Sequence, residues 1–122
     1  MNAVVNWLDR QARTSVWTTA VTVLEIRFGL QVMATGKRRS LLIAAFERLL
    51  AELIQQRIAP FAGEAAQRAA DLMAIGQKKG RSGELRDSMI AGIALASHAT
   101  LATRNAKHFD DLSVSVLNPW ES

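Results

Sequence analysis

The residue best suited to chemistry in this sequence is Asp87, because it combines a charge with a place on an apolar helix face. The helix predicted to follow Arg86 has an apolar stripe, formed by Ile90, Ala91, Ala94, Leu95 and His98. Asp87 heads this stripe, which should pack on a sheet rather than face water. An acid in a helix's first turn often only complements the helix dipole. The alternative is that Asp87 binds a metal ion.

Two further polar residues are expected at the same edge of the sheet as Asp87. A strand predicted at residues 100–103 delivers Asn105 to its carboxyl end, and Glu25 lies in the first turn of a helix that follows a predicted strand directly. In βαβ units the helices run antiparallel to the strands, so all three side chains should meet at one edge. Taken alone, Glu25 would be interpreted as a solvent-facing residue that complements the helix dipole.

Carboxylate and amide oxygens together suggest a hard divalent cation, Mg²⁺ or Mn²⁺. A metal held in this way can activate water and neutralise a phosphodiester during hydrolysis. Cysteine is absent, which excludes disulfides, thiolate catalysis and zinc sites of the cysteine type. Any metal chemistry must therefore use oxygen ligands.

The histidines and the remaining acids of this region are weaker candidates. His98 lies on the apolar stripe and is expected to be a packed, hydrogen-bonded core residue. His108, Asp110 and Asp111 follow Asn105 in a polar loop, where solvation at the surface is expected. Of these three, Asp110 could reach the site.

The net charge of +4 is concentrated in two groups of basic residues. These groups are Lys37, Arg38 and Arg39, and then Lys78, Lys79, Arg81 and Arg86. Such groups suit a polyanion such as nucleic acid. Each group taken alone could equally be a solvated helix end.

The 122 residues suggest a single domain, 1–122, in which helices and strands alternate. Helices are predicted at 2–11, 22–34, 40–56, 63–79 and from 86 onward, and strands at 15–21, 57–61, 100–103 and 114–117. Gly36 is expected to end the helix at 22–34, and residues 80–83 are expected to form a flexible loop. This order predicts a three-layer α/β domain with a parallel sheet.

Two features of the chain bear on partners and location. The helix at 40–56 is apolar on two faces, which favours a homo-oligomer or a bound protein over a fully buried helix. The sequence has neither an apolar run of membrane-spanning length nor a secretory leader, so no membrane association and a cytoplasmic location are expected.

The segments TTAVTVLEIRFGL and RDSMIAGIALASHATLATRNAKHF resemble the PIN-domain endoribonucleases, most closely the VapC-type toxins of type II toxin–antitoxin pairs. The resemblance covers nearly the whole chain and implies a three-layer α/β/α, Rossmann-like fold. It also implies RNA cleavage with Mg²⁺ or Mn²⁺ and a cognate antitoxin as partner. Glu25 and Asp87 would be metal ligands, with Asn105 the third catalytic residue. Thr103, Arg104 and Arg86 would contact the RNA.

The sequence departs from the family pattern at two places. Many PIN domains have an aspartate where this chain has Asn105, which would weaken that ligand. The family's first strand, which ends in an Asp-Thr-Asn type motif, has no counterpart in this sequence. We therefore expect the 122-residue chain to have little activity. The alternative function is a non-catalytic interaction module that binds an antitoxin or self-associates. A third function, nucleotide binding by a doubly wound domain, is ranked low because it would need a glycine-rich phosphate loop, which this sequence lacks.

Overall fold

The computed structural model describes residues 3–12, 15–81, 83–109, 112 and 114–119, and for residues 3–5 only the backbone. The chain divides into two compact units, which are described separately. The smaller unit is Ala12–Ala59, and the larger unit combines Met1–Gln11 with Pro60–Ser122.

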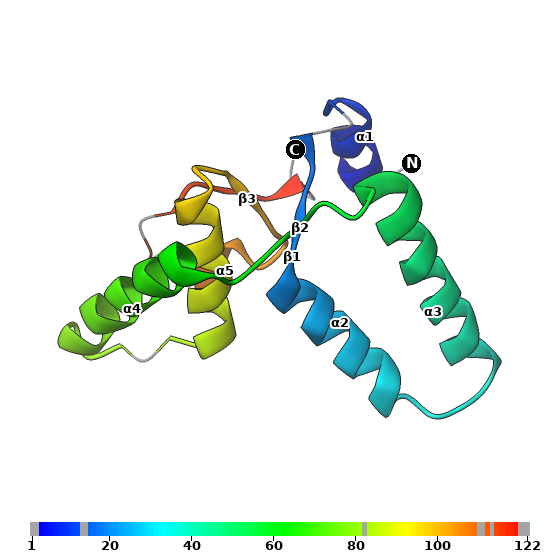
Figure 1. Cartoon of the computed structure of the whole chain (residues 1–122), viewed down its shortest axis with the longest axis horizontal. Coiled ribbons are helices and arrows are strands. Elements are labelled where there is room, and N and C mark those ends of the chain that lie inside the picture. Colours follow the sequence, from blue (N-terminus) through cyan, green and yellow to red (C-terminus); the bar gives the residue numbers. More distant parts are fainter. Residues whose placement is uncertain (1–2, 13–14, 82, 110–111, 113, 120–122) are drawn as a thin grey trace. The chain divides into compact units, whose positions relative to one another are not determined.

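Within its described residues, the smaller unit contains two α-helices, one π-helix and one parallel strand pair (Figure 1). Its elements are β1 (Thr18–Thr19), α2 (Ala20–Val32), α3 (Lys37–Arg48), the π-helix η2 (Leu49–Ile54) and β2 (Ile58–Ala59). Strands β1 and β2 pair in parallel, with Thr18 opposite Ile58. The core of this unit is formed by Phe46, Leu50 and Ile54.

Local capping decides where the elements of the smaller unit begin. The Thr19 side chain accepts a hydrogen bond from the backbone N–H of Thr22 at 3.0 Å, so α2 begins at Ala20. The predicted strand at 15–21 is therefore wrong in length and is limited to Thr18–Thr19. The prediction for Gly36 is also wrong, because α2 ends at Val32 and Gly36 is instead the N-cap of α3.

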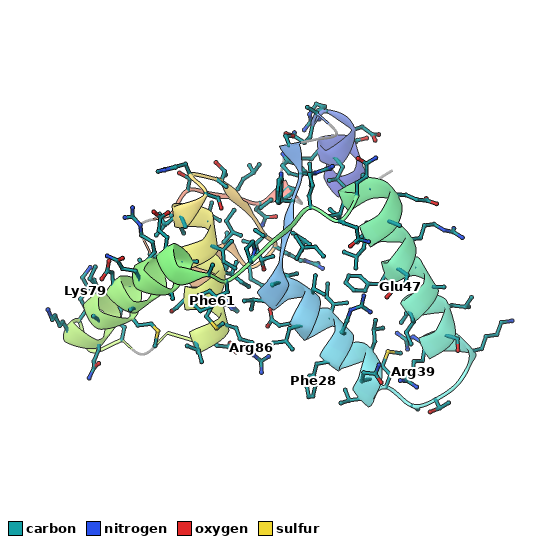
Figure 2. The ribbon with its side chains drawn as sticks, viewed as in Figure 1. Phe28, Arg39, Glu47, Phe61, Lys79 and Arg86 are labelled. Carbon is teal, nitrogen blue, oxygen red and sulfur yellow. The ribbon has the colours of Figure 1, made fainter. Side chains whose placement is uncertain are left out.

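Side chains of arginine hold the two long helices of the smaller unit together. Arg27 forms an ion pair with Glu47 at 2.6 Å, and its guanidinium lies 5.3 Å from the centroid of the Phe46 ring. Arg39 donates to the carbonyl oxygen of Leu30 at 2.8 Å, which satisfies a carbonyl at the end of α2. Both contacts join α2 to α3, and Figure 2 shows Arg39 and Glu47 on α3.

The larger unit carries the remaining elements. These are α1 (Ala3–Asp9), α4 (Gly63–Lys78), α5 (Leu85–Ala96), β3 (Leu101–Ala102), the 3₁₀-helix η3 (Ala106–Phe109) and β4 (Val116–Leu117). Strands β3 and β4 also pair in parallel, with Leu101 opposite Val116. Leu72, Ala91 and Phe109 form the core of this unit. The helix–strand order and the parallel pairing were predicted correctly, whereas η3 was not predicted.

Helices α4 and α5 cross at very short distance because small residues line their contact. A Cβ atom built on Gly92 would lie 2.5 Å from the carbonyl oxygen of Ala65 and 3.0 Å from the Cβ of Ala69. Ala91 is completely buried beside it. Only glycine therefore fits at position 92 without moving one helix away from the other.

We expect Gly92→Ala to destabilise the protein by about 1–3 kcal/mol, because the added methyl group overpacks the α4–α5 contact. The control is Gly29→Ala in α2, where an added Cβ meets nothing within 4 Å. There alanine should stabilise by about 0.5–1 kcal/mol, since it lowers the entropy cost of forming the helix. Urea unfolding measures both changes. Equal stability of Gly92→Ala and the unmodified protein would contradict the close crossing.

No helix within the described ranges is both long and apolar enough to cross a membrane.

Candidate functional site

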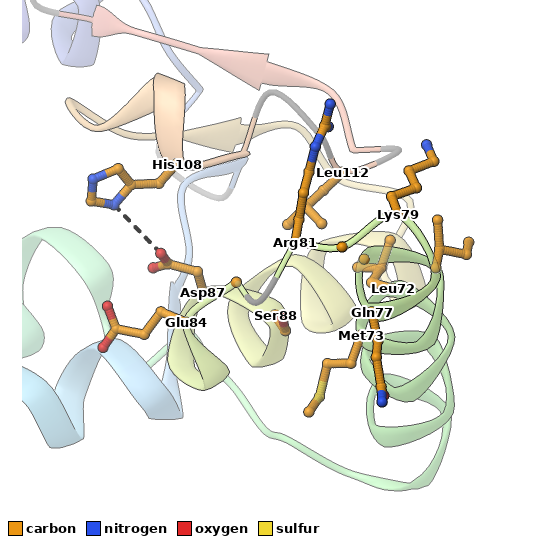
Figure 3. Close-up of a pocket in the computed structure, with 14 residues that line it drawn as sticks. Leu72, Met73, Gln77, Lys79, Arg81, Glu84, Asp87, Ser88, His108 and Leu112 are labelled. Carbon is orange, nitrogen blue, oxygen red and sulfur yellow. Dashed lines mark ion pairs between the residues drawn. The ribbon is translucent and has the colours of Figure 1, made fainter.

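Asp87 lies in the first turn of α5, at the surface of the larger unit. Its side chain is 22% exposed, and its Oδ2 atom lies 3.4 Å from Nδ1 of His108. His108 comes from η3, where the adjacent Phe109 is buried in the core. Figure 3 shows the Asp87 carboxylate and the His108 ring facing each other. The segment after β3 therefore reaches the start of α5 through His108, and the predicted meeting of Asn105 with Asp87 stays a prediction.

The charge of Asp87 is poorly stabilised by its surroundings. Burial raises the pKa of the Asp87 carboxyl above its ordinary value of 3.8, the positive charge and hydrogen bond of His108 lower it, and the negative charge of Glu84 raises it. The net direction is upward. Because Glu84, the N-cap residue of α5, and Asp87 in its first turn carry like charges three residues apart, a cation bound between them would relieve the repulsion.

The segment Thr103, Arg104 and Asn105 forms a short polar turn after β3. The backbone N–H of Asn105 donates to Oγ1 of Thr103 at 3.1 Å, and Nδ2 of Asn118 donates to the carbonyl oxygen of Arg104 at 3.4 Å. Asn105 and Arg104 are exposed, as is Arg86 at the start of α5. Their predicted roles in catalysis and RNA binding stay predictions.

Glu25 lies on α2, in the smaller unit, and is half-buried. Because α2 begins at Ala20, Glu25 is in the second turn, and the prediction of a first-turn position is wrong. Its meeting with Asp87 stays a prediction. Among the described residues, no group of three or more histidine and acidic side chains is placed to hold one metal ion.

Both histidines are exposed, and of the two it is His108 that faces Asp87. Helix α5 ends at Ala96, so His98 lies beyond it, is exposed, and has a positive φ of 53°. The prediction of a core histidine is wrong for this reason. His108 has a side chain that is 56% exposed, as expected for a loop, yet it faces Asp87. The signal for its position was Phe109, an apolar residue that anchors an otherwise polar segment. Asp110 and Asp111 lie outside the described residues.

The raised pKa of Asp87 predicts a stability change with a defined sign. The folded protein binds this proton more tightly than the unfolded chain, so stability falls as the pH rises from 3.8 through the folded pKa. In EDTA, we expect Asp87→Asn to melt at a higher temperature than the unmodified protein at about pH 7. The difference should disappear below the unfolded pKa, at about pH 3.5.

The control for this measurement is Asp71→Asn, which makes the same chemical change on the exposed face of α4. It should leave the melting temperature nearly unchanged at both pH values. A lower melting temperature for Asp87→Asn at neutral pH would mean that the carboxylate is stabilised rather than desolvated.

The larger unit also contains a cavity of about 450 Å³ beside Asp87. It is lined by the end of α4, the segment that connects α4 to α5, the first turn of α5, His108 and Leu112 (Figure 3). Volumes of this size are typical of sites that bind small ligands. The acidic residue most suited to chemistry therefore opens onto a space large enough for a substrate group.

Comparison with known proteins identifies the family. The PIN domain family profile matches residues 2–114. The VapC ribonuclease Y4jK of Sinorhizobium fredii is 35% identical over 119 residues, which cover 98% of this chain and 85% of that protein. The crystal structure of FitAcB from Neisseria gonorrhoeae is similar with a TM-score of 0.87 and 32% identity, over 98% of this chain and 86% of that chain.

A third similar structure is VapBC-5 from Mycobacterium tuberculosis, a member of the VapBC family of toxin–antitoxin systems. Its TM-score is 0.69 and its identity 28%, over 84% of this chain and 79% of that chain. These matches confirm the resemblance to VapC-type proteins that the two sequence segments indicated. The chain therefore belongs to the PIN-domain family, and its fold is the three-layer α/β/α fold with parallel strands.

Proposed function

We propose that this protein is the ribonuclease toxin of a toxin–antitoxin pair and hydrolyses RNA phosphodiesters with Mg²⁺ or Mn²⁺. The observation that carries the proposal is Asp87, a half-buried carboxyl whose pKa is raised by burial and by Glu84. A carboxylate that is costly to keep charged is typical of functional sites. Membership of the PIN-domain family and the similarity to a VapC ribonuclease support the same reaction.

The donor set suits a hard divalent cation. Asp87 supplies a carboxylate, Glu84 adds a second negative charge nearby, and Asn105 lies on the segment that approaches this end of α5. We propose Asp87 and Glu25 as the metal ligands and Asn105 as an indirect ligand. When bound, Mg²⁺ would supply an activated water and neutralise charge on the phosphate.

The residues of the chain itself would prepare this site for the metal. His108 lies at 3.4 Å from Oδ2 of Asp87 and restricts the orientation of that carboxylate. Phe109, buried in the core, fixes the backbone next to His108. Exposed Arg86 and Arg104, with Thr103 between β3 and Asn105, would hold the RNA backbone through charge and hydrogen bonds.

Metal binding provides the sharpest test of this function. Asp87→Asn keeps the shape of the side chain but removes a formal charge, so we expect Mn²⁺ affinity to fall by at least about tenfold in titration calorimetry. Glu25→Gln should behave in the same way. The matched control is Asp71→Asn on α4, which should bind Mn²⁺ like the unmodified protein. Unchanged Mn²⁺ affinity in Asp87→Asn would contradict the proposed site.

Cleavage of single-stranded RNA with Mg²⁺ follows from the same site. We expect little cleavage by the 122-residue chain, and Mg²⁺-dependent cleavage when a strand ending in aspartate, as in the family pattern, precedes it. Asp87→Asn should abolish this cleavage, because the loss of charge weakens metal binding and raises the pKa of metal-bound water. Full cleavage by Asp87→Asn would favour the non-catalytic interaction module instead.

An antitoxin partner is supported by the apolar surface of the smaller unit. Leu24, Phe28 and Val32 lie four residues apart on α2 and are 60%, 60% and 67% exposed. Figure 2 shows the Phe28 side chain pointing away from α3. Leu41, Leu42, Leu49 and Leu53 on α3 and η2 are exposed as well. So much exposed apolar area in one small unit favours a protein partner.

We expect Phe28→Glu to weaken binding of the cognate antitoxin by at least about tenfold, because aromatic residues commonly dominate such interfaces. Binding is measured by calorimetry, and size-exclusion chromatography with light scattering reports self-association of the toxin alone. Leu85→Glu in the larger unit is the control, since Leu85 is 56% exposed and receives the same charge. Equal antitoxin affinity of the two variants would argue against the α2 surface.

A further inference from the structure

The cavity beside Asp87 has an acidic end and a basic end. The Asp87 carboxylate faces His108 on one side, with Glu84 beside it, whereas the side chains of Lys79 and Arg81 lie on the other side and extend in a common direction (Figure 3). The rest of the lining is mainly apolar and includes Leu72, Met73 and Leu112. A ligand that fits this space would carry negative charge at one end and an uncharged body beside it.

The basic end is built by the way the chain leaves α4. The backbone N–H of Gly80 donates to the carbonyl oxygen of Gln77 at 3.0 Å, and that of Arg81 donates to the carbonyl oxygen of Gly76 at 2.8 Å. Gly80 has a φ of +73°, which glycine adopts without strain. These bonds turn the chain back over the last turn of α4. Lys79 and Arg81 are thereby held at the edge of the cavity.

The charges at the two ends of the cavity decide which part of a nucleic acid could bind at each end. A phosphate group would be repelled by the two carboxylates unless a cation lies between them, whereas Lys79 and Arg81 attract a phosphate directly. An unpaired nucleobase has flat aromatic faces, which the apolar lining can cover. Met73 is well suited to this contact because its side chain is flexible and polarisable. Single-stranded RNA combines both features within one nucleotide.

We propose that this cavity binds one nucleotide of single-stranded RNA next to the phosphodiester held at Asp87. The base lies against Leu72, Met73 and Leu112, and Lys79 and Arg81 contact the phosphate of this nucleotide. The inference rests on the proposed ribonuclease function and extends it, because it assigns a nucleotide subsite to Lys79, Arg81 and the apolar residues that line the cavity with them. A volume of about 450 Å³ is within the range of sites that accept ligands of this size.

The test measures RNA binding without cleavage. A fluorescein-labelled single-stranded RNA pentamer is titrated with the full chain in EDTA, and anisotropy gives the dissociation constant at several salt concentrations. We expect the double substitution Lys79→Ala with Arg81→Ala to weaken binding by about tenfold. It should also reduce the slope of log K against log salt by about 0.7, the value for one phosphate on a single strand, because both side chains contact the same phosphate.

The matched control is Arg10→Ala with Arg48→Ala, which removes the same charge at two exposed positions that do not line the cavity. This variant should bind RNA within about twofold of the unmodified protein. A second cavity variant, Met73→Trp, fills the space without changing charge and should also weaken binding. Thermal unfolding of each variant verifies that the chain is folded.

Three results would overturn the inference: unchanged affinity in the Lys79 and Arg81 variant, equal weakening in the control, or unchanged affinity in Met73→Trp. Asp87→Asn should bind the pentamer at least as well as the unmodified protein in EDTA, because it loses a negative charge near the RNA. If cleavage depends on Asp87 while the cavity variants bind normally, the ribonuclease function stands and the subsite fails. If the cavity variants lose RNA binding while no form cleaves, the subsite stands and catalysis fails.

Discussion

The close crossing of α4 and α5 is the constraint on which the larger unit depends. Gly92 lies against the backbone of Ala65 and Ala69, where even a methyl group would collide. With so little space between the two helices, α5 has little freedom to rotate or slide along α4. Asp87 precedes Gly92 by five residues on the same helix, so its position is set by this packing. The cavity beside Asp87 depends on the same crossing, since the last turns of α4 form one of its walls.

The charged site that this packing creates lowers the stability of the folded protein. Burial and the like charge of Glu84 both raise the pKa of Asp87, while His108 only partly compensates them. Such an arrangement costs stability in the absence of a cation and gains from binding one, which is the usual relation between stability and activity at functional sites. The packing of Leu72, Ala91 and Phe109 in the core of the same unit offsets this loss of stability. Phe109 is also the neighbour of His108, so core and site are joined through two adjacent residues.

The two units carry different parts of the proposed function. The larger unit holds Asp87, His108 and the cavity, whereas the smaller unit exposes large apolar side chains on α2 and on α3 with η2. The core cluster of the smaller unit consists of the buried residues Phe46, Leu50 and Ile54, and its helices are joined at their surfaces by Arg27 and Arg39. A surface of this kind would be covered by a bound antitoxin. Glu25, which is proposed as a metal ligand, lies on α2 in the smaller unit.

The sequence by itself determined the order of the elements, their parallel pairing and the place of Asp87 in the first turn of α5, because these follow from local periodicity. The ends of the elements were less well predicted. The Thr19 side chain caps α2, which begins at Ala20, and Gly36 is the N-cap residue of α3 rather than the end of α2. Only the tertiary structure decided which histidine faces Asp87. Helix α5 stops before His98, and the burial of Phe109 brings His108 to the carboxylate. The cavity likewise depends on the turn after α4 and on His108 and Leu112 from the segment after β3, so periodicity could not reveal that Lys79, Arg81 and Asp87 line the same cavity.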